Sequence, residues 1–164
     1  MMQFNLTATT CAQAAGQRIP AGAYIQDAQL NLYRMNKSGH PTGNKTGYLS
    51  AFPRVFDGVT MDPTGTNAVT WNNSPGHGAA IGSSVLVSSF NIIPAQGQWF
   101  QIGAGAKVRQ LFTVSDQSQY WWSLIPERNG NSTQYADYCS TRSSCATNGQ
   151  QPNMRIAFFT QGPV

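Results

Sequence analysis

A chain of 164 residues with only 10% charged residues and a single glutamate has few side chains for the solvent faces of amphipathic helices, which favours an all-β fold. The formal net charge of +4 comes from lysines and arginines that stand singly, without the basic run that follows a phosphate backbone, so the sequence argues against a nucleic-acid partner. No stretch approaches the about 18 uninterrupted apolar residues of a membrane helix, and we expect no membrane insertion.

Short strands bounded by turn residues are predicted along most of the chain. The clearest lies in AYIQDAQLNLYRM, where Ala28, Leu30 and Leu32 alternate with polar residues, the period of a half-buried strand. The segment YLSAFPRVF alternates in the same way, and Pro53 predicts a sheet edge or a bulge there. Further strands are predicted at 68–71, 84–93, 98–102, 120–125, 134–141 and 154–160.

One segment has helical spacing instead. In AGAKVRQLFTVSD, the residues Ala104, Val108, Leu111 and Phe112 recur at the spacing of one helix face, which predicts a short helix near residues 104–113. The sequence has no internal repeat, low-complexity tract or linker, so residues 1–164 are expected to form one domain. The spacing of the strands predicts a β-sandwich with jelly-roll character.

The inventory of reactive side chains argues against catalysis. A Ser–His mechanism needs an oriented imidazole, but His40 and His77 lie in Gly/Pro-rich loops and the chain has no G-x-S-x-G motif. Glycoside hydrolysis needs two suitably spaced carboxylates, and Glu127 and five aspartates make such a pair possible. Asp27, however, lies on the polar face of a strand, and Asp57 and Asp62 lie in turn sequences where Asp bonds to the local backbone. We therefore expect a protein that is not an enzyme, with a glycoside hydrolase-like activity as a minor alternative.

No cofactor is expected. The cysteines and histidines lack the spacing of a zinc site. The segment DGVTMDPTG offers Asp57, Asp62 and loop carbonyls, which are oxygen ligands of the kind that Ca²⁺ takes. Turn formation by these aspartates is the favoured explanation, because Asp side chains bond to nearby backbone groups in turns.

Aromatic residues provide the strongest case for a ligand. In QYWWSLI, Trp121 and Trp122 take opposite faces of a strand, so that if one fills the core the other points outward. An outward indole stacks on the apolar face of a sugar while polar neighbours bind its hydroxyls, and Tyr120, Asn129 and Asn131 are near in sequence. The alternative, favoured for each tryptophan taken alone, is that the ring is packed in the interior.

Four other residues are assigned structural roles. Trp71 ends a short strand before a loop that Pro75 stiffens, and we expect it to close the core rather than contact a ligand. Cys139 and Cys145 flank STRSS, but close spacing alone leaves open whether they form a disulfide. Cys11 has no evident partner in the sequence.

Four segments, taken in chain order, resemble one family. They are IPAGAYIQDAQLNLY, AVTWNNSP, WFQIGAGAKVRQLF and ADYCSTRSSCATNGQQPNMRIAFF. Together they are similar to the DNRLRE-type domain, a jelly-roll module similar to certain carbohydrate-binding modules, over most of the chain from Ile19 onward. The resemblance places Trp71 at a recurrent framework position of that module.

The sequence departs from the family pattern in two places. Family members carry further strands ahead of a segment similar to QFNLTAT, whereas this sequence starts at that segment. Members often have an acidic residue at the start of the short helix, but Gly103 to Lys107 include no carboxylate, which puts a cap or ion site there in doubt.

These observations favour a non-catalytic structural or adhesive subunit of a surface assembly, an extracellular fibre or a virion. Its expected partners are copies of itself or neighbouring assembly proteins, and its expected location is the extracellular surface or a virion. Because the leading strands are missing, we expect a strand of a neighbouring subunit to cover an open sheet edge, with the chain's own MQFNLTATTCAQ as the alternative. The alternative function is a carbohydrate-binding module with glycans as ligands.

Overall fold

The computed structural model describes part of the chain. The described residues are 2–4, 19, 23–35, 47–53, 55–56, 59–60, 65–66, 68, 70, 86–90, 95–112, 120–126, 138–140 and 144–160.

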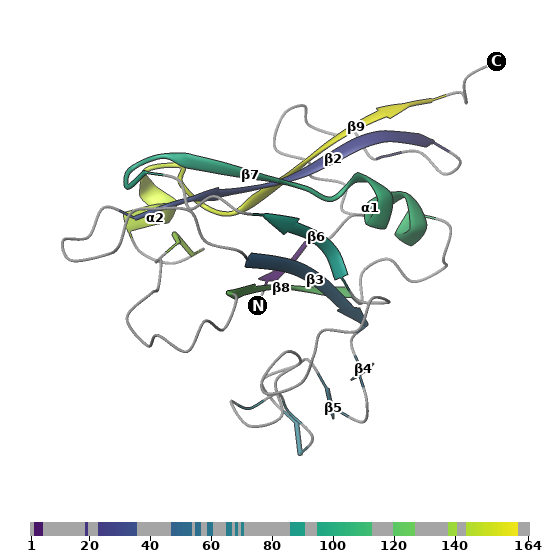
Figure 1. Ribbon diagram of the computed structural model, residues 1–164, viewed down its shortest axis with the longest axis horizontal. Helices are drawn as coiled ribbons and strands as arrows, with labels where there is room; N and C mark the ends of the chain where they lie inside the picture. The colour runs from purple at the N-terminus through teal and green to yellow at the C-terminus, as the bar shows by residue number, and fades with distance from the viewer. Residues whose placement is uncertain are drawn as a thin grey trace.

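Three antiparallel strands form one sheet in the order β7-β2-β9 (Figure 1). The strands are β2 (Tyr24–Tyr33), β7 (Trp99–Gly103) and β9 (Asn153–Phe159). Leu30 of β2 lies opposite Ile102 on one side and Met154 on the other, so the apolar residues of all three strands share one face. The alternation seen in the sequence therefore directs the polar residues of β2 to the opposite face of this sheet.

The second sheet has the order β1-β8-β3-β6. Its strands are β1 (Met2–Gln3), β8 (Tyr120–Pro126), β3 (Gly47–Pro53) and β6 (Leu86–Phe90), and a short pair, β4 (Val55–Phe56) and β5 (Val59–Thr60), follows β3. Ala51 pairs with Trp122 and Leu49 with Leu124, which places these four side chains on one face. Pro53 ends β3 opposite Tyr120, beyond the stretch of β3 that pairs with β6.

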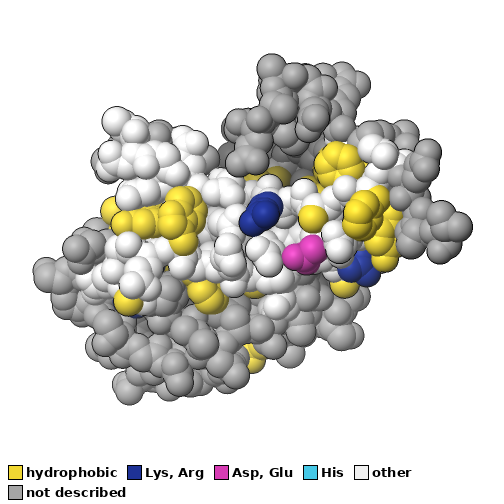
Figure 2. Space-filling model, turned by 90° about the horizontal axis from the view of Figure 1, so that it is seen from above, with side chains coloured by type: hydrophobic (Ala, Val, Ile, Leu, Met, Phe, Trp, Pro, Cys, Tyr) yellow, Lys and Arg dark blue, Asp and Glu magenta, His cyan; other side chains and the backbone are white. Residues whose placement is uncertain are grey.

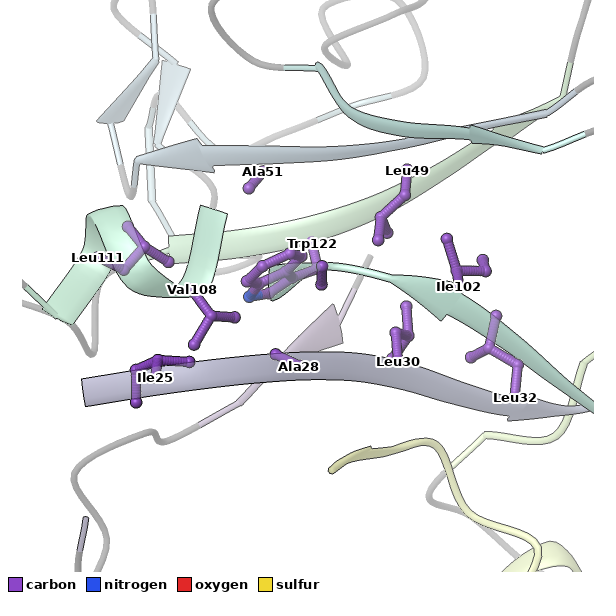
Figure 3. Packing of buried hydrophobic residues seen from close by; sticks show 11 residues of the cluster. Ile25, Ala28, Leu30, Leu32, Leu49, Ala51, Ile102, Val108, Leu111 and Trp122 are labelled. Carbon is purple, nitrogen blue, oxygen red and sulfur yellow. The ribbon is translucent and has the colours of Figure 1, made fainter. Parts of the chain in front are cut away.

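The two sheets and helix α1 (Gly105–Phe112) enclose one hydrophobic core. Trp122 is its largest buried side chain and lies between residues of the β3 strand and residues of the β2 strand, with Val108 of α1 beside them (Figure 3). Val108 and Leu111 are buried because they follow one face of the helix at i, i+3 spacing. A buried aromatic of this size contributes strongly to stability, since Trp removes a large apolar area from water.

The predicted fold class was an all-β β-sandwich with jelly-roll character and one short helix near residues 104–113. It is confirmed as an all-β sandwich: two antiparallel sheets face each other and α1 spans Gly105–Phe112. Strands lie within or across the segments predicted at 84–93, 98–102, 120–125 and 154–160. The segment predicted at 134–141 differs, because its described residues pair only through an isolated bridge between Tyr138 and Arg34. In the segment 68–71, Ala68 forms a single bridge, and Trp71 lies outside the described residues.

One edge of the second sheet is covered by the chain itself. Met2 lies opposite Trp122 and Gln3 opposite Trp121, so β1 pairs antiparallel with β8. Met2 and Phe4 also pack against the core. The chain's own N-terminal segment, the alternative to a neighbouring strand in the sequence analysis, thus pairs at this edge.

Cys139 and Cys145 form a disulfide, with their Cα atoms 5.5 Å apart. The Cys139 N–H donates to the Tyr33 carbonyl at 2.9 Å, which attaches this segment to the end of β2. Cys145 lies in the short helix α2 (Ser144–Thr147), whose following turn is closed by the Gln150 N–H bonding to the Cys145 carbonyl at 2.8 Å. The disulfide answers the question that the spacing of the two cysteines left open.

Among the described helices, none has the length and apolar content needed to cross a membrane.

Candidate functional site

The outer face of the sheet β7-β2-β9 carries the polar side chains that the core excludes. Asp27, Gln29, Asn31 and Tyr33 of β2 alternate with buried apolar residues and point away from the core. Their cross-strand neighbours on this outer face are Gln101, Gly103 and Trp99 of β7 and Asn153, Arg155, Ala157 and Phe159 of β9. We call this set of residues, together with Tyr24, the outer sheet face.

A bulge in β2 brings Tyr24 onto the outer sheet face. The pairing with β9 shifts register between Ile25 and Asp27, which places Gln26 as the extra residue. Ile25 and Ala28 are buried while Tyr24, Gln26 and Asp27 are exposed. Tyr24 and Asp27 are three positions apart and would take opposite faces of a regular strand, but the bulge puts both on the outer one.

Aromatic rings occupy both ends of the outer sheet face. At one end, the rings of Tyr33 and Trp99 meet edge to face, with centroids 5.5 Å apart and planes at 74°. At the other end, Tyr24 lies opposite Phe159. Trp99, Tyr24 and Phe159 are 43%, 40% and 50% exposed. Figure 2 looks onto this side of the molecule and shows hydrophobic groups toward both ends, with a basic and an acidic side chain between them.

A glycine turn determines where Trp99 lies. Gly97 has a φ of 73°, in the left-handed region that favours glycine, and its N–H donates to the Arg34 carbonyl at 3.0 Å. The Arg34 N–H donates in turn to the Gln98 carbonyl at 2.9 Å, so the turn is held in register with the end of β2. The turn thereby delivers Trp99 to the position opposite Tyr33.

Between the aromatic ends lies an open hollow of about 200 Å³, lined by Asp27, Gln29, Arg155 and Ala157. Gly103 lies opposite Gln29, and the space that a side chain there would fill is open. The lining of the hollow therefore combines a carboxylate, an amide and a guanidinium with the methyl group of an alanine. These groups supply both donors and acceptors of hydrogen bonds.

The two charged groups of the hollow have different surroundings. The Asp27 Oδ1 atom lies 3.1 Å from the position that a Cβ on Gly105 would occupy, at the first residue of α1, where a negative charge is favourable. Arg109 of α1 is close by, and its Nη2 donates to the Gln26 carbonyl at 3.1 Å. Within the described residues, no ion pair or hydrogen bond of the Arg155 guanidinium is seen, and Arg155 is exposed. Arg155 is thus the cation of this face that is open to a ligand.

Amide side chains extend the polar surface toward Trp99. The Asn31 Nδ2 donates to the Asn153 Oδ1 across the strands at 2.8 Å, and the Asn153 Nδ2 donates to the Gln151 carbonyl at 3.4 Å. Gln101, opposite Asn31, is exposed. Amides and a guanidinium bind hydroxyl groups, while exposed ring faces pack on the C–H faces of sugars, so this surface suits a polyhydroxylated ligand.

The residues that the sequence proposed for a glycan site lie elsewhere. Trp122 is fully buried, so its assignment to the site is corrected: a ring enclosed by both sheets has no face to offer a sugar. Tyr120 is half-buried against the core, and the Lys107 Nζ lies 5.2 Å from its ring centroid. Trp121 is half-buried on the opposite side of β8 from Trp122, beside Phe52. All three belong to the β1-β8-β3-β6 sheet and do not join the outer sheet face.

Several predicted residues fall outside the part of the chain that the structure describes. They are Asn129 and Asn131 of the proposed glycan site, Trp71 and Pro75 of the framework, Asp57 and Asp62 of the possible Ca²⁺ site, and Cys11. Within the described residues, no group of three or more His, Cys, Asp or Glu side chains is arranged to hold a metal ion. Asp27 is the one carboxylic acid side chain in the described ranges, so a pair for glycoside hydrolysis is not formed there.

Sequence reasoning did not select the aromatic residues of the outer sheet face. The signal was present in part, because Tyr33 is in phase with the polar Gln29 and Asn31, and Trp99 is in phase with Gln101. An aromatic that continues the polar phase of an alternating strand is directed to the solvent face. That Tyr33 and Trp99 meet depends on the pairing of β2 with β7, which the alternation does not specify.

A comparison of the chain with known protein families, with curated proteins and with solved structures finds no match in any of the three. The resemblance to the DNRLRE-type domain therefore stays a prediction.

Proposed function

We propose that the protein is a non-catalytic, adhesive module that binds carbohydrate on the outer sheet face. The observation that carries this proposal is the placement of exposed aromatic rings at both ends of a polar strand face, around a hollow that holds Arg155 and Asp27. Rings and polar groups in this arrangement contact the C–H faces and the hydroxyls of a sugar at the same time.

The exposure of the rings supports a binding role. Trp99, Tyr24 and Phe159 leave large apolar surfaces in water, although the same sandwich buries Trp122 completely. Scattered exposed apolar residues are ordinary, but aromatic groups bordered by polar residues mark interaction sites. Tyr33 and Trp99 also hold each other in a defined edge-to-face geometry, which limits the entropy lost when a ligand stacks on them.

The disulfide between Cys139 and Cys145 supports the expected location at the extracellular surface or on a virion. Such bonds persist in oxidising environments and are rare in reducing ones. A carbohydrate-binding module at either of these locations would be exposed to the glycans that it binds.

Affinity electrophoresis tests the proposal. The protein is run through native gels that contain xylan, mannan, β-glucan or dextran, and we expect at least one of these to retard it. Trp99→Ala and Arg155→Gln should each weaken the retardation, because they remove a stacking ring and a hydroxyl ligand. Lys107→Gln is the matched control, since it removes the same charge from α1, where Lys107 lies over Tyr120 and bonds to Gln110. Failure of these four polysaccharides and of the acidic polygalacturonate to retard the protein would refute carbohydrate binding.

Assembly with other subunits is a second candidate, favoured by one observation. Among the described strands, β9 pairs with β2 only, so one side of its backbone is open to another strand, and the exposed Phe159 lies at its end. An assembly subunit should form multimers of defined mass in light scattering. Elution as a monomer at all accessible concentrations would argue against this candidate and leave carbohydrate binding untouched.

A further inference from the structure

We infer that the outer sheet face takes the interior of an extended, uncharged polysaccharide chain that lies along β2 from the Tyr33–Trp99 pair to the Tyr24–Phe159 pair. This inference rests on the proposed function and specifies its ligand. It excludes two simpler ligands, a short sugar held at one ring and an acidic polysaccharide held by basic side chains.

The length of the outer sheet face indicates a ligand of several consecutive sugar units. Tyr24 and Tyr33 are the first and last residues of β2, and both face outward because of the bulge at Gln26. Nine residue steps at about 3.3 Å separate the two aromatic ends by about 30 Å along the strand. A mono- or disaccharide covers a small part of this distance. Only several consecutive sugar units can contact both aromatic ends at once.

The outer sheet face is open, which indicates that it binds the interior of a polysaccharide chain rather than its end. Trp99 and Phe159 are about half exposed, so solvent reaches the rings at both ends of the outer sheet face. The hollow between them is also open, with Gly103 contributing no side chain to its border. A site that recognises a chain end encloses that end, whereas an open strip with contacts at both ends accepts a chain that continues past it.

The charges of the outer sheet face indicate that the ligand is uncharged. The outer sheet face holds one carboxylate, Asp27, and one guanidinium, Arg155, and its other polar side-chain groups are the uncharged amides, the Tyr hydroxyls and the Trp99 indole N–H. An acidic polymer would meet Asp27 in the hollow, and a basic one would meet Arg155. The neighbouring cations of α1 are engaged elsewhere: Arg109 donates to the Gln26 carbonyl and Lys107 to Gln110. A chain of neutral sugars matches this balance best.

The test measures affinity against chain length. Oligosaccharides from the disaccharide to the octasaccharide, prepared from whichever neutral polysaccharide retards the protein, are titrated by calorimetry. We expect the affinity to rise with length until both aromatic ends are contacted and then to level off. Trp99→Ala and Phe159→Ala should each lower the affinity for the longest oligosaccharide about fivefold or more, by analogy with stacking of bases on aromatic side chains. The losses should multiply in the double variant, since the two rings lie too far apart to interact directly.

The outcomes separate this inference from the proposed function. If a neutral polysaccharide binds but the disaccharide binds as tightly as the octasaccharide, the interior-chain assignment is overturned and carbohydrate binding stands. If polygalacturonate retards the protein and the neutral polymers do not, the uncharged ligand is overturned. The length dependence is measured on the unmodified chain, so it stays decisive even where an alanine variant fails to fold. Trp99→Tyr, which keeps a stacking ring, should restore most of the affinity that Trp99→Ala loses.

Discussion

Asp27 of β2 provides the carboxylate at the start of α1 that the helix's own sequence lacks: its Oδ1 lies 3.1 Å from where a Cβ on Gly105 would be. The two residues are far apart in sequence, and the pairing of β2 with β7 brings them together. A bond from the Ala104 N–H to the Ala28 carbonyl, 2.7 Å long, holds the entry to the helix against β2. The absence of an acidic residue from Gly103 to Lys107 is thus compensated by a neighbouring strand.

We expect Gly105→Ala to destabilise the protein although alanine is the better helix former. The new Cβ would lie 3.1 Å from Asp27 Oδ1 and 3.4 Å from the Ala28 nitrogen, so the carboxylate must move away from the helix terminus. A charge in that place is worth about 0.3–1 kcal/mol. Urea unfolding of Gly105→Ala, alone and combined with Asp27→Ala, measures the effect. The destabilisation should shrink or reverse in the Asp27→Ala background, and an unchanged effect there would contradict the explanation.

Trp122→Ala should lower the free energy of unfolding by about 3–5 kcal/mol, the usual cost of removing a fully buried aromatic ring. Trp122 has no exposed surface, and both sheets pack on it. Trp121→Ala, the neighbouring and half-buried tryptophan, is the matched comparison and should cost less. Urea unfolding measures both losses. Equal losses in the two variants would contradict the conclusion that Trp122, and not Trp121, packs in the core.

The Cys139–Cys145 disulfide closes a loop with a sequence separation of 6, and the chain-entropy estimate for so short a loop is about 2 kcal/mol. Cys139→Ser with Cys145→Ser should lower the stability by about that amount. Thiol titration in a Cys11→Ser background checks the bond itself. The unfolded, unreduced chain should show no free thiol, and the reduced chain should show both; free thiols before reduction would disprove the bond.

Burial raises the pKa of Tyr138 above its ordinary value of 10.0, and the nearby positive charge of Arg34 offsets part of this increase. The folded protein therefore holds the phenol proton more tightly than the unfolded chain does. The stability that this supplies is complete below pH 10 and is lost as the pH rises through the folded-state pKa. Tyr138→Phe should remove this alkaline loss.

The Tyr138→Phe comparison is best made in a Lys107→Gln background. Burial lowers the pKa of Lys107, so its titration makes the stability rise with pH in the region just below its ordinary value of 10.5 and works in the opposite direction. Urea unfolding at several alkaline pH values then measures the contribution of Tyr138 to the pH dependence of the free energy of unfolding. An identical alkaline slope with and without the phenol hydroxyl would rule out Tyr138 as its source.

The amino-acid sequence by itself determined the local structure of this protein. The alternation around Leu30 and Leu32 specified a strand with one buried face, because successive strand side chains point to opposite sides. The spacing of Val108 and Leu111 specified a short helix. The adjacency of Trp121 and Trp122 meant that at most one ring could enter the core from a regular strand.

Only the tertiary structure decided which surfaces these elements bury and which they leave open. Trp122 and not Trp121 is buried, because the pairing of β8 with β3 turns Trp122 to the side that faces β2. Tyr33 meets Trp99, and Tyr24 meets Phe159, across strands that are distant in the chain. Periodicity sets the face of each residue within its own strand, but the register between strands depends on long-range packing of the core and on the bulge at Gln26, so the outer sheet face could not be assembled from the sequence pattern alone.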